Sequence, residues 1–217
     1  MARVQPEDGR IGDIWRITGA EHEMVVQQLN RYTITLNSVS ERQPSGWGYD
    51  LDGWDNVLYR IREDLSEVRA GDVVHLYVPP TDVYLLGVKI DSRSPSLSAW
   101  FGFQVGRDPE PEVEDSGLYF HPSADETFDC ELLLRPFALL SDGARVRDAN
   151  GRQWRFAAPL FFTDENDARG EPAWPVELPG DEAATEVLRA TSPAEQMAAW
   201  TERCGVDPSG FGHTWQL

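Results

Sequence analysis

The architecture can be predicted from Asp72-Val-Val-His-Leu-Tyr-Val-Pro-Pro-Thr-Asp-Val-Tyr-Leu-Leu-Gly-Val-Lys-Ile90. Its β-branched and aromatic side chains favour strands. Residues 72–78 and 83–90 predict two strands, and the proline pair at 79–80 predicts a turn between them. His75 alternates with apolar neighbours, so we expect an exposed or hydrogen-bonded imidazole there, not a metal ligand.

Strand patterns continue on both sides of this stretch. We expect strands at 11–17, 24–29, 32–36, 100–105, 130–134, 137–140 and 159–162, with a tight turn at Asn30-Arg31. Segment 57–65 fits a strand or a short helix. The clearest hairpin is 144–156, because Asn150-Gly151 supplies the positive φ that tight hairpin turns require.

The C-terminal region has a helical pattern. We expect helices at 181–189 and 192–204, the second with Ser192 as N-cap, a proline after it and a stop at Gly205. Met197 and Trp200 fall on one helical face and should dock on the sheet. The aromatic end, 211–217, is also expected to pack.

The predicted fold is mainly β, with antiparallel barrel- or sandwich-like sheets and a C-terminal helical pair (α+β overall). The predicted organisation is one compact domain. Its segments are a flexible tail at 1–10, a first β unit at 11–107 that could be an SH3-like barrel, an acidic loop at 108–127, a second β unit at 128–178 and a helical region at 179–217.

A short motif occurs twice. Arg10-Ile-Gly-Asp-Ile14 and Arg69-Ala-Gly-Asp-Val73 share the pattern Arg-x-Gly-Asp-aliphatic at an offset of 59 residues. Two copies of one barrel-like unit would explain it. Ordinary turn chemistry would also explain it, since Gly-Asp before a strand is common.

Arg10–Ile17 followed by Met24–Gln27 resembles the first strands of the SH3-like barrels of the PemK/MazF endoribonuclease toxins. The resemblance implies a local barrel topology. The toxins carry a basic loop between those strands, whereas Thr18–Glu23 is acidic here and the chain is about twice as long. We therefore do not assign the chain to this family and expect no RNA cleavage.

Composition and charge exclude several classes of protein. With 37 acidic and 19 basic residues the net charge is −18, which opposes the phosphate contacts of nucleic-acid binding. The apolar content of 41% excludes a disordered chain. No apolar run suits a membrane span or a secretion signal, so we expect a cytoplasmic protein without membrane contact. Lys89 is the only lysine, which suggests a GC-rich bacterial genome.

No catalytic or cofactor-binding motif is present. The chain lacks Gly-x-Ser-x-Gly, a phosphate-binding loop and a dinucleotide-binding fingerprint. Cys130 and Cys204 are far apart and are expected as buried free thiols. The four histidines have no metal-ligand spacing. We therefore expect no cofactor, no metal and no catalytic residue, and favour a protein that is not an enzyme.

Two segments have the composition of a partner-binding surface. The first is an aromatic, acidic, glycine-rich loop, and the second lies in a run from 108 to 131 that has nine acids and no Lys or Arg. Trp and Tyr dominate interface energetics, and acids attract basic partners. The candidate residues are Trp47, Tyr49, Asp50, Asp52, Trp54, Asp55, Glu110, Glu112, Glu114 and Asp115.

The sequence predicts a non-catalytic acidic interaction protein that binds a basic protein partner, as an immunity protein or antitoxin does. One alternative is a small-molecule-binding module or accessory enzyme of bacterial metabolism, with a pocket lined by Tyr84, Trp100, Phe101 and Trp154. Another is an assembly component of a phage or secretion particle. The oligomeric state is not predicted.

Overall fold

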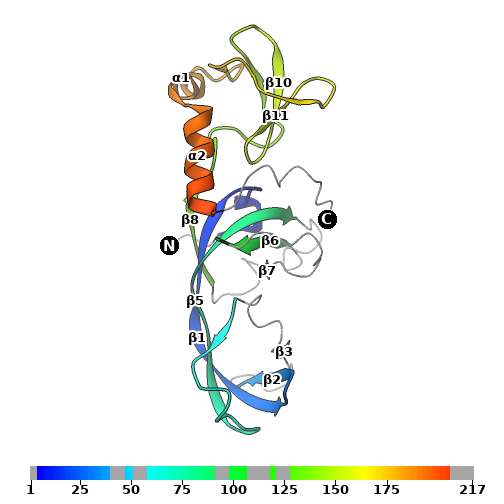
Figure 1. The fold of residues 1–217 in the computed structure, drawn as a ribbon, viewed down its shortest axis with the longest axis vertical. Coiled ribbons are helices and arrows are strands. Elements are labelled where there is room, and N and C mark those ends of the chain that lie inside the picture. The colour runs from blue at the N-terminus through cyan, green and yellow to red at the C-terminus, as the bar shows by residue number, and fades with distance from the viewer. Residues whose placement is uncertain are drawn as a thin grey trace.

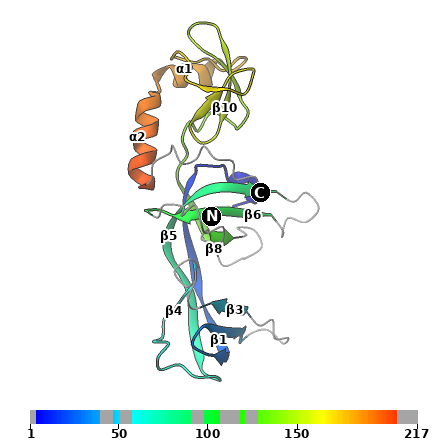
Figure 2. The same cartoon turned by 45° about the vertical axis from the view of Figure 1, so that its right-hand side comes forward.

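The computed structural model describes residues 4–39, 47–50, 58–90, 98–106, 118–120 and 128–205. It confirms a mainly antiparallel β architecture with two C-terminal helices. Figures 1 and 2 show three parts along the long axis: a first lobe around β2–β4, a second lobe around β6–β8, and a C-terminal module that holds a small sheet and the helices.

The large sheet contains the strands of both lobes. The order of its main path is β3-β2-β1-β5-β6-β7, while β4 pairs with β5 and β8 pairs with β1. The described strands thus form an open, sandwich-like sheet and no closed barrel. A short 3-10 helix, η1 (Pro6–Asp8), precedes β1 (Ile14–Leu29), β2 (Thr33–Ser38), β3 (Trp47–Asp50), β4 (Arg60–Ile61), β5 (Val73–Lys89), β6 (Ala99–Gln104), β7 (Leu118–Phe120) and β8 (Phe128–Leu134).

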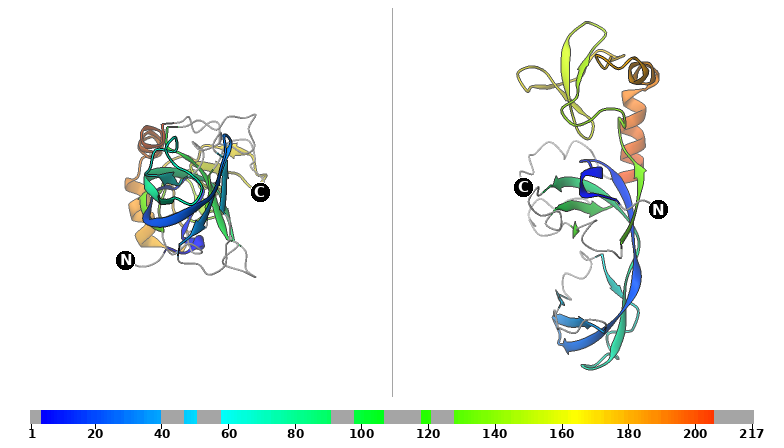
Figure 3. Two further views of the ribbon diagram at one scale, coloured as in Figure 1. Left: turned by 90° about the horizontal axis from the view of Figure 1, so that it is seen from below. Right: turned by 180° about the vertical axis from the view of Figure 1, so that it is seen from behind.

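Two long strands connect the lobes, and this corrects two predictions. β1 continues through Thr18–Glu23, which was expected to be a loop, and β5 continues through the Pro79-Pro80 pair, which was expected to be a turn. The prolines fall where the β1–β5 register shifts, between the pairs Gly19↔Val78 and Ile17↔Thr81. A missing N–H is tolerated at such an irregularity. Figure 3 shows β1 and β5 side by side through both lobes.

The Gly-Asp turns before β1 and β5 have the same structure. Gly12 has φ +84° and donates its N–H to the Leu85 carbonyl at 2.7 Å, while Gly71 has φ +95° and donates to the Val26 carbonyl at 2.7 Å. The two acceptors are again 59 residues apart. Each turn therefore opens one long strand and is bound to the other.

The β1–β5 register maps onto itself under the same offset. Adding 59 to a β1 residue and subtracting 59 from its partner gives another observed pair. Examples are Trp15↔Val83, its equivalent Met24↔Val74, and Gly19↔Val78, which is its own equivalent. A pseudo-two-fold axis therefore passes between Gly19 and Val78. A Cβ at Gly19 would lie 3.0 Å from the Val78 side chain, so the strands approach closely there.

The remaining strands obey the same symmetry. A register shift occurs between Val26 and Gln28 on the β1–β2 side and between Leu85 and Gly87 on the β5–β6 side, which are equivalent positions. β4 pairs with β5, and β8 pairs with β1, so each unit gives its last strand to the other. The structure thus favours a repeat over ordinary turn chemistry: β1–β4 and β5–β8 are two structurally equivalent, interlocked units.

Each lobe has its own apolar core, built from equivalent positions of the long strands. Alternation along a strand sends every second side chain to the same face. The first core contains Met24, Val26, Ile34, Leu36, Val74 and Leu76. The second contains Trp15, Ile17, Leu58, Val78, Val83, Leu85, Trp100 and Leu118.

The C-terminal module packs on the outer face of the second lobe. It contains β9 (Arg145–Arg147), β10 (Gln153–Ala157), β11 (Phe161–Thr163), β12 (Arg169–Gly170), α1 (Glu182–Ala190) and α2 (Pro193–Cys204). The shared core includes Ile14, Tyr84 and Phe103 of the large sheet with Phe156 and Trp200 of the module. On the first lobe, the equivalent of Ile14 is Val73, which is 49% exposed because nothing in the described structure covers it.

The hairpin and both helices are confirmed. β9 and β10 flank the Asn150-Gly151 turn, with Gly151 at φ +81°. Asp181 and Ser192 are the N-caps, and α2 ends at Gly205 with φ +76°. Trp200 is fully buried and Met197 packs beside the core, as predicted.

Two assignments in the middle of the chain differ from the prediction. Residues 137–140 form a turn closed by the Leu140 N–H on the Phe137 carbonyl, 2.8 Å, where a strand was expected. Phe137 and Leu140 are buried, whereas Ala138 and Leu139 are exposed, and the Arg10 guanidinium binds the carbonyls of Phe137 and Leu140 in place of a neighbouring strand. β8 belongs to the large sheet, although its residues were assigned to the second β unit. Segment 57–65 contains only the short strand β4.

The first Gly-Asp turn is the joint between the second lobe and the module. Asp13 is fully buried, accepts from Arg135 Nε at 2.9 Å and from Arg135 Nη2 at 2.6 Å, and accepts the Arg10 N–H at 2.8 Å. Trp200 Nε1 of α2 donates to the Gly12 carbonyl at 2.7 Å. In the second copy of the turn, Asp72 is exposed, and its carboxylate accepts the Arg69 N–H and no other hydrogen bond among the described residues.

Candidate partner-binding surfaces

The predicted interface residues fall at the edge of the described structure or outside it. Trp47, Tyr49 and Asp50 lie on β3, which pairs with β2, so this part of the expected loop is a strand. The others lie outside the described residues: Asp52, Trp54, Asp55, Glu110, Glu112, Glu114 and Asp115.

An acidic cluster on the first lobe surrounds one histidine. His75 of β5 lies opposite Glu23 of β1. Its Nδ1 is 2.6 Å from Glu63 Oε1, and its Nε2 is 3.9 Å from Glu21 Oε1. Glu63 also accepts the His75 N–H at 2.9 Å. This carboxylate patch, Glu21, Glu23 and Glu63 around His75, is partly exposed, and Arg62 forms an ion pair with Glu21.

The patch perturbs the ionisation of its members. The hydrogen bond to Glu63 raises the pKa of His75, and the charges of Glu63, Glu21 and Glu23 act in the same direction. Desolvation opposes ionisation of Glu63, but its bonds with His75 outweigh that effect and lower the pKa of Glu63. His75 is thus a hydrogen-bonded imidazole, as predicted.

The equivalent position on the second lobe has balanced charge. The counterparts of Glu23 and His75 are Asp82 and Arg16, whose side chains form two bonds of 2.8 and 3.1 Å. Arg203 of α2 also binds Asp82 at 3.1 Å. Arg16 and Arg203 pair with Asp82 there, and Glu131 of β8 lies opposite Arg16, so two arginines face two carboxylates. In the first-lobe patch, carboxylates outnumber arginines. Among the described residues, the unbalanced carboxylates at this position lie on the first lobe.

We expect the free energy of unfolding to depend on the protonation of His75, and therefore on pH. Because its pKa is raised in the folded state, the stabilisation from protonated His75 is fully present below its ordinary value of 6.5 and is lost as pH rises through the folded-state pKa. An NMR titration of the His75 ring should give a pKa above 6.5, and the free energy of unfolding should decline over the same interval.

Glu63→Gln should lower the His75 pKa and remove that decline. Glu67→Gln is the matched control, since it removes the same charge from the same exposed segment without contacting His75. An unshifted His75 titration in Glu63→Gln would rule out the interaction.

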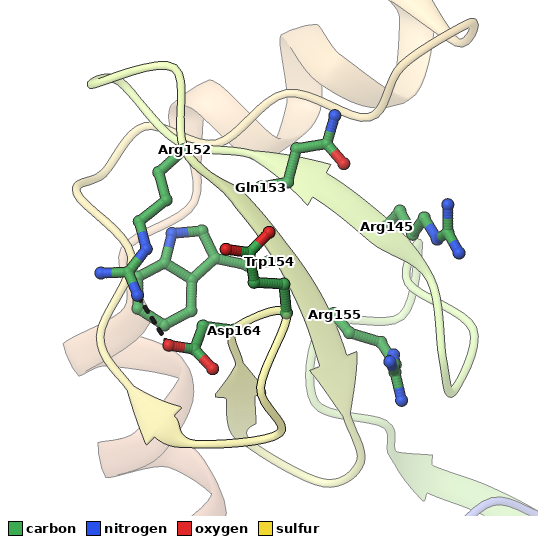
Figure 4. A pocket seen from close by; sticks show the side chains of 7 residues that line it. Arg145, Arg152, Gln153, Trp154, Arg155 and Asp164 are labelled. Carbon is green, nitrogen blue, oxygen red and sulfur yellow. Dashed lines mark hydrogen bonds and ion pairs between the residues drawn. The ribbon is translucent and has the colours of Figure 1, made fainter.

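A second candidate site lies on the C-terminal module. A cavity of about 510 Å³ is lined by Arg145, Arg152, Gln153, Trp154, Arg155, Asp164 and Glu165. Figure 4 shows Arg145 and Arg155 projecting on the same side of neighbouring strands, with Arg152 bound to Asp164 at the other end of the site. Arg152 also stacks on the Trp154 ring at 4.5 Å. We call this set the arginine pocket.

The four aromatic residues that were predicted to line one small-molecule pocket do not do so. Tyr84, Trp100 and Phe101 are buried core residues, at 0, 0 and 3% exposure, whereas Trp154 lines the arginine pocket. An apolar groove of about 560 Å³ lies elsewhere on the module, between β11 and the start of α2, where Phe161, Trp174 and Met197 line it.

The described structure contains no other chemical centre. Among its residues, no group of His, Cys, Asp or Glu side chains could hold a metal ion. Cys130 and Cys204 are free thiols, half-buried and buried. Burial raises the pKa of Cys130 to about 11, with a contribution from Asp129, so this thiol is protonated at neutral pH. No described helix is long and apolar enough to cross a bilayer.

Neither surface was predicted from the sequence, although the alternation of charged residues in each segment indicates an outward face. Glu21 and Glu23 alternate as outward residues of β1, whereas the sequence of 18–23 predicts a loop. Arg145, Arg147 and Arg155 alternate with apolar residues on both arms of the predicted hairpin, which places them on one face. The large negative net charge of the whole chain masks this local concentration of arginine.

Comparisons with known proteins give no relative: no family model, curated protein or solved structure matches the chain.

Proposed function

We propose that the protein is a non-catalytic interaction protein whose first lobe binds a basic protein partner through the carboxylate patch. The observation that carries the proposal is the difference between the two copies of the repeat. On the second lobe, the equivalent surface is occupied by the Arg16–Asp82 ion pair and by Arg203 of the C-terminal module, which binds Asp82. The first lobe leaves the same surface acidic and uncovered in the described structure.

Charge and exposure support a role in binding. Glu21 and Glu63 have 32 and 29% of their side-chain surface exposed, so a partner's arginine or lysine could reach the carboxylates. Guanidinium groups bind carboxylates bidentately and strongly. The net charge of −18 would accelerate encounter with a basic partner at low salt.

We further propose the kind of partner and the cellular compartment. An acidic protein that covers the basic active surface of a toxin would act as an immunity protein or antitoxin does. We place this activity in a bacterial cytoplasm, where free thiols such as those at 130 and 204 persist. Glu110, Glu112, Glu114 and Asp115, which lie outside the described residues, remain predicted contacts of the same partner.

Three immobilised proteins test the proposal in lysate of the source organism at low and physiological salt. The wild type should retain one basic protein in stoichiometric amount, with recovery falling as salt rises. Glu21→Gln/Glu23→Gln/Glu63→Gln should lower its recovery at least tenfold. The matched control, Glu182→Gln/Glu195→Gln/Glu202→Gln, removes the same charge from α1 and α2 and should stay within twofold of the wild type.

Equal loss in both triple variants would show that only total charge matters, which contradicts a specific patch. Equal recovery by the wild type and the patch variant would also contradict the proposal. A fourth variant, Glu110→Gln/Glu112→Gln/Glu114→Gln/Asp115→Asn, shows separately whether the predicted acidic segment takes part.

A further inference from the structure

The small sheet carries a local excess of arginine in an acidic protein. Residues 135–170 hold six of the 19 basic residues and five of the 37 acidic ones. The arginine pocket lies on this sheet, and its arginines come from both arms of the hairpin. Residues 135–170 are therefore close to neutral, whereas the lobes are strongly acidic.

The outward face of the small sheet brings like charges together. Arg145 of β9 lies directly opposite Arg155 of β10, Arg155 lies opposite Thr163, and Thr163 lies opposite Arg169. Like charges directly opposite each other across strands are destabilising. Folding alone gives no reason to place two guanidinium groups there, but an anion bound between them would remove the repulsion.

The pocket has hydrogen-bonding capacity to spare. Arg152 is held by Asp164 at 2.7 Å, and Arg155 reaches Asp167 at 3.1 Å, with Asp167 71% exposed. Arg145 has no ion pair and no side-chain hydrogen bond among the described residues. A guanidinium offers five N–H donors in a planar fork. Arg145, the remaining donors of Arg155 and the Gln153 amide are thus available to an oxyanion.

The negative charge of the lobes favours a compact anion over an extended one. An extended polyanion would be repelled by the acidic lobes, whereas a compact group inside the pocket is screened from them over about 8 Å at physiological salt. A dianion gains more from two facing guanidinium groups than a monoanionic carboxylate does, and arginine forks match phosphate oxygens in geometry.

We propose that the arginine pocket binds a phosphoryl group between Arg145 and Arg155. The group could belong to a free phosphomonoester or to a phosphorylated side chain of a partner. This proposal is independent of the proposed function, because the pocket and the carboxylate patch lie on different parts of the molecule (Figure 1).

Calorimetric titration of the full chain with inorganic phosphate, phenyl phosphate, a phosphoserine peptide and its unphosphorylated form tests the proposal at constant ionic strength. Phosphate and phenyl phosphate should bind the wild type, and acetate should bind at least tenfold more weakly. Preference for the phosphopeptide over phenyl phosphate would identify a partner side chain as the source, and the reverse would identify a free ester.

The variant Arg145→Gln/Arg155→Gln should weaken phosphate binding at least tenfold. Arg189→Gln is the control, because it removes an exposed arginine of α1 that does not line the pocket and should change binding less than twofold. Should the double variant not fold, Arg145→Gln alone is expected to weaken binding several-fold. Absent phosphate binding, or equal losses in the pocket and control variants, would overturn the proposal.

Discussion

Asp13→Asn should destabilise the protein by about 3 kcal/mol, because it removes the anionic member of a buried ion pair. The Asp13 carboxylate is fully buried and accepts two bonds from Arg135 and one from the Arg10 backbone. An amide presents N–H donors to the guanidinium and leaves part of it unpaired. Chemical denaturation monitored by circular dichroism measures the change.

Asp72→Asn is the matched control, since Asp72 occupies the same position in the other copy of the repeat. It is exposed and binds the Arg69 N–H at 2.8 Å, which asparagine can also accept. We expect a loss below about 1 kcal/mol. Equal effects of the two substitutions would refute the view that only the first turn has become a joint.

Trp200→Ala should cost about 4 kcal/mol, within the range for truncating a large buried aromatic side chain. Trp200 is fully buried, meets the Tyr84 ring edge-on at 6.3 Å between centroids, and donates to the Gly12 carbonyl at 2.7 Å. Its removal leaves a cavity between α2 and the second lobe and one unbonded carbonyl. Amide hydrogen exchange should accelerate in α2 and the small sheet before it does in the first lobe.

Trp200→Phe separates packing from hydrogen bonding. It keeps most of the aromatic volume and loses the Nε1 donor, so we expect a loss of about 1–2 kcal/mol. A loss in Trp200→Phe as large as in Trp200→Ala would show that the hydrogen bond, and not the packing, holds α2 in place. Uniform acceleration of exchange along the whole chain would contradict a separable module.

Features set by local chemistry were predictable. The Asn150-Gly151 hairpin, the helix start near Asp181, the N-cap Ser192 and the stop at Gly205 follow from residues within one turn. The repeat was visible because its marker is a turn whose glycine needs a positive φ and whose aspartate binds the preceding backbone. Its extent was not visible, since the two copies share little beyond the turn.

Features set by distant pairing were not predictable. Pro79-Pro80 and Thr18–Glu23 look like breaks, yet β1 and β5 support each other through them. The apolar residues 137–140 look like a strand, but Arg10, more than a hundred residues away, binds their carbonyls as a turn. The carboxylate patch needs Glu21, Glu63 and His75 from three elements, which no local pattern brings together.

Hydrogen–deuterium exchange on the complex with the captured basic partner tests the central claim most directly. The first-lobe patch predicts protection at 21–25, 60–65 and 73–77, with the equivalent second-lobe segments 80–84 and 14–18 unchanged. Protection confined to the second lobe or to the small sheet would contradict the account, as would the absence of any basic partner to measure.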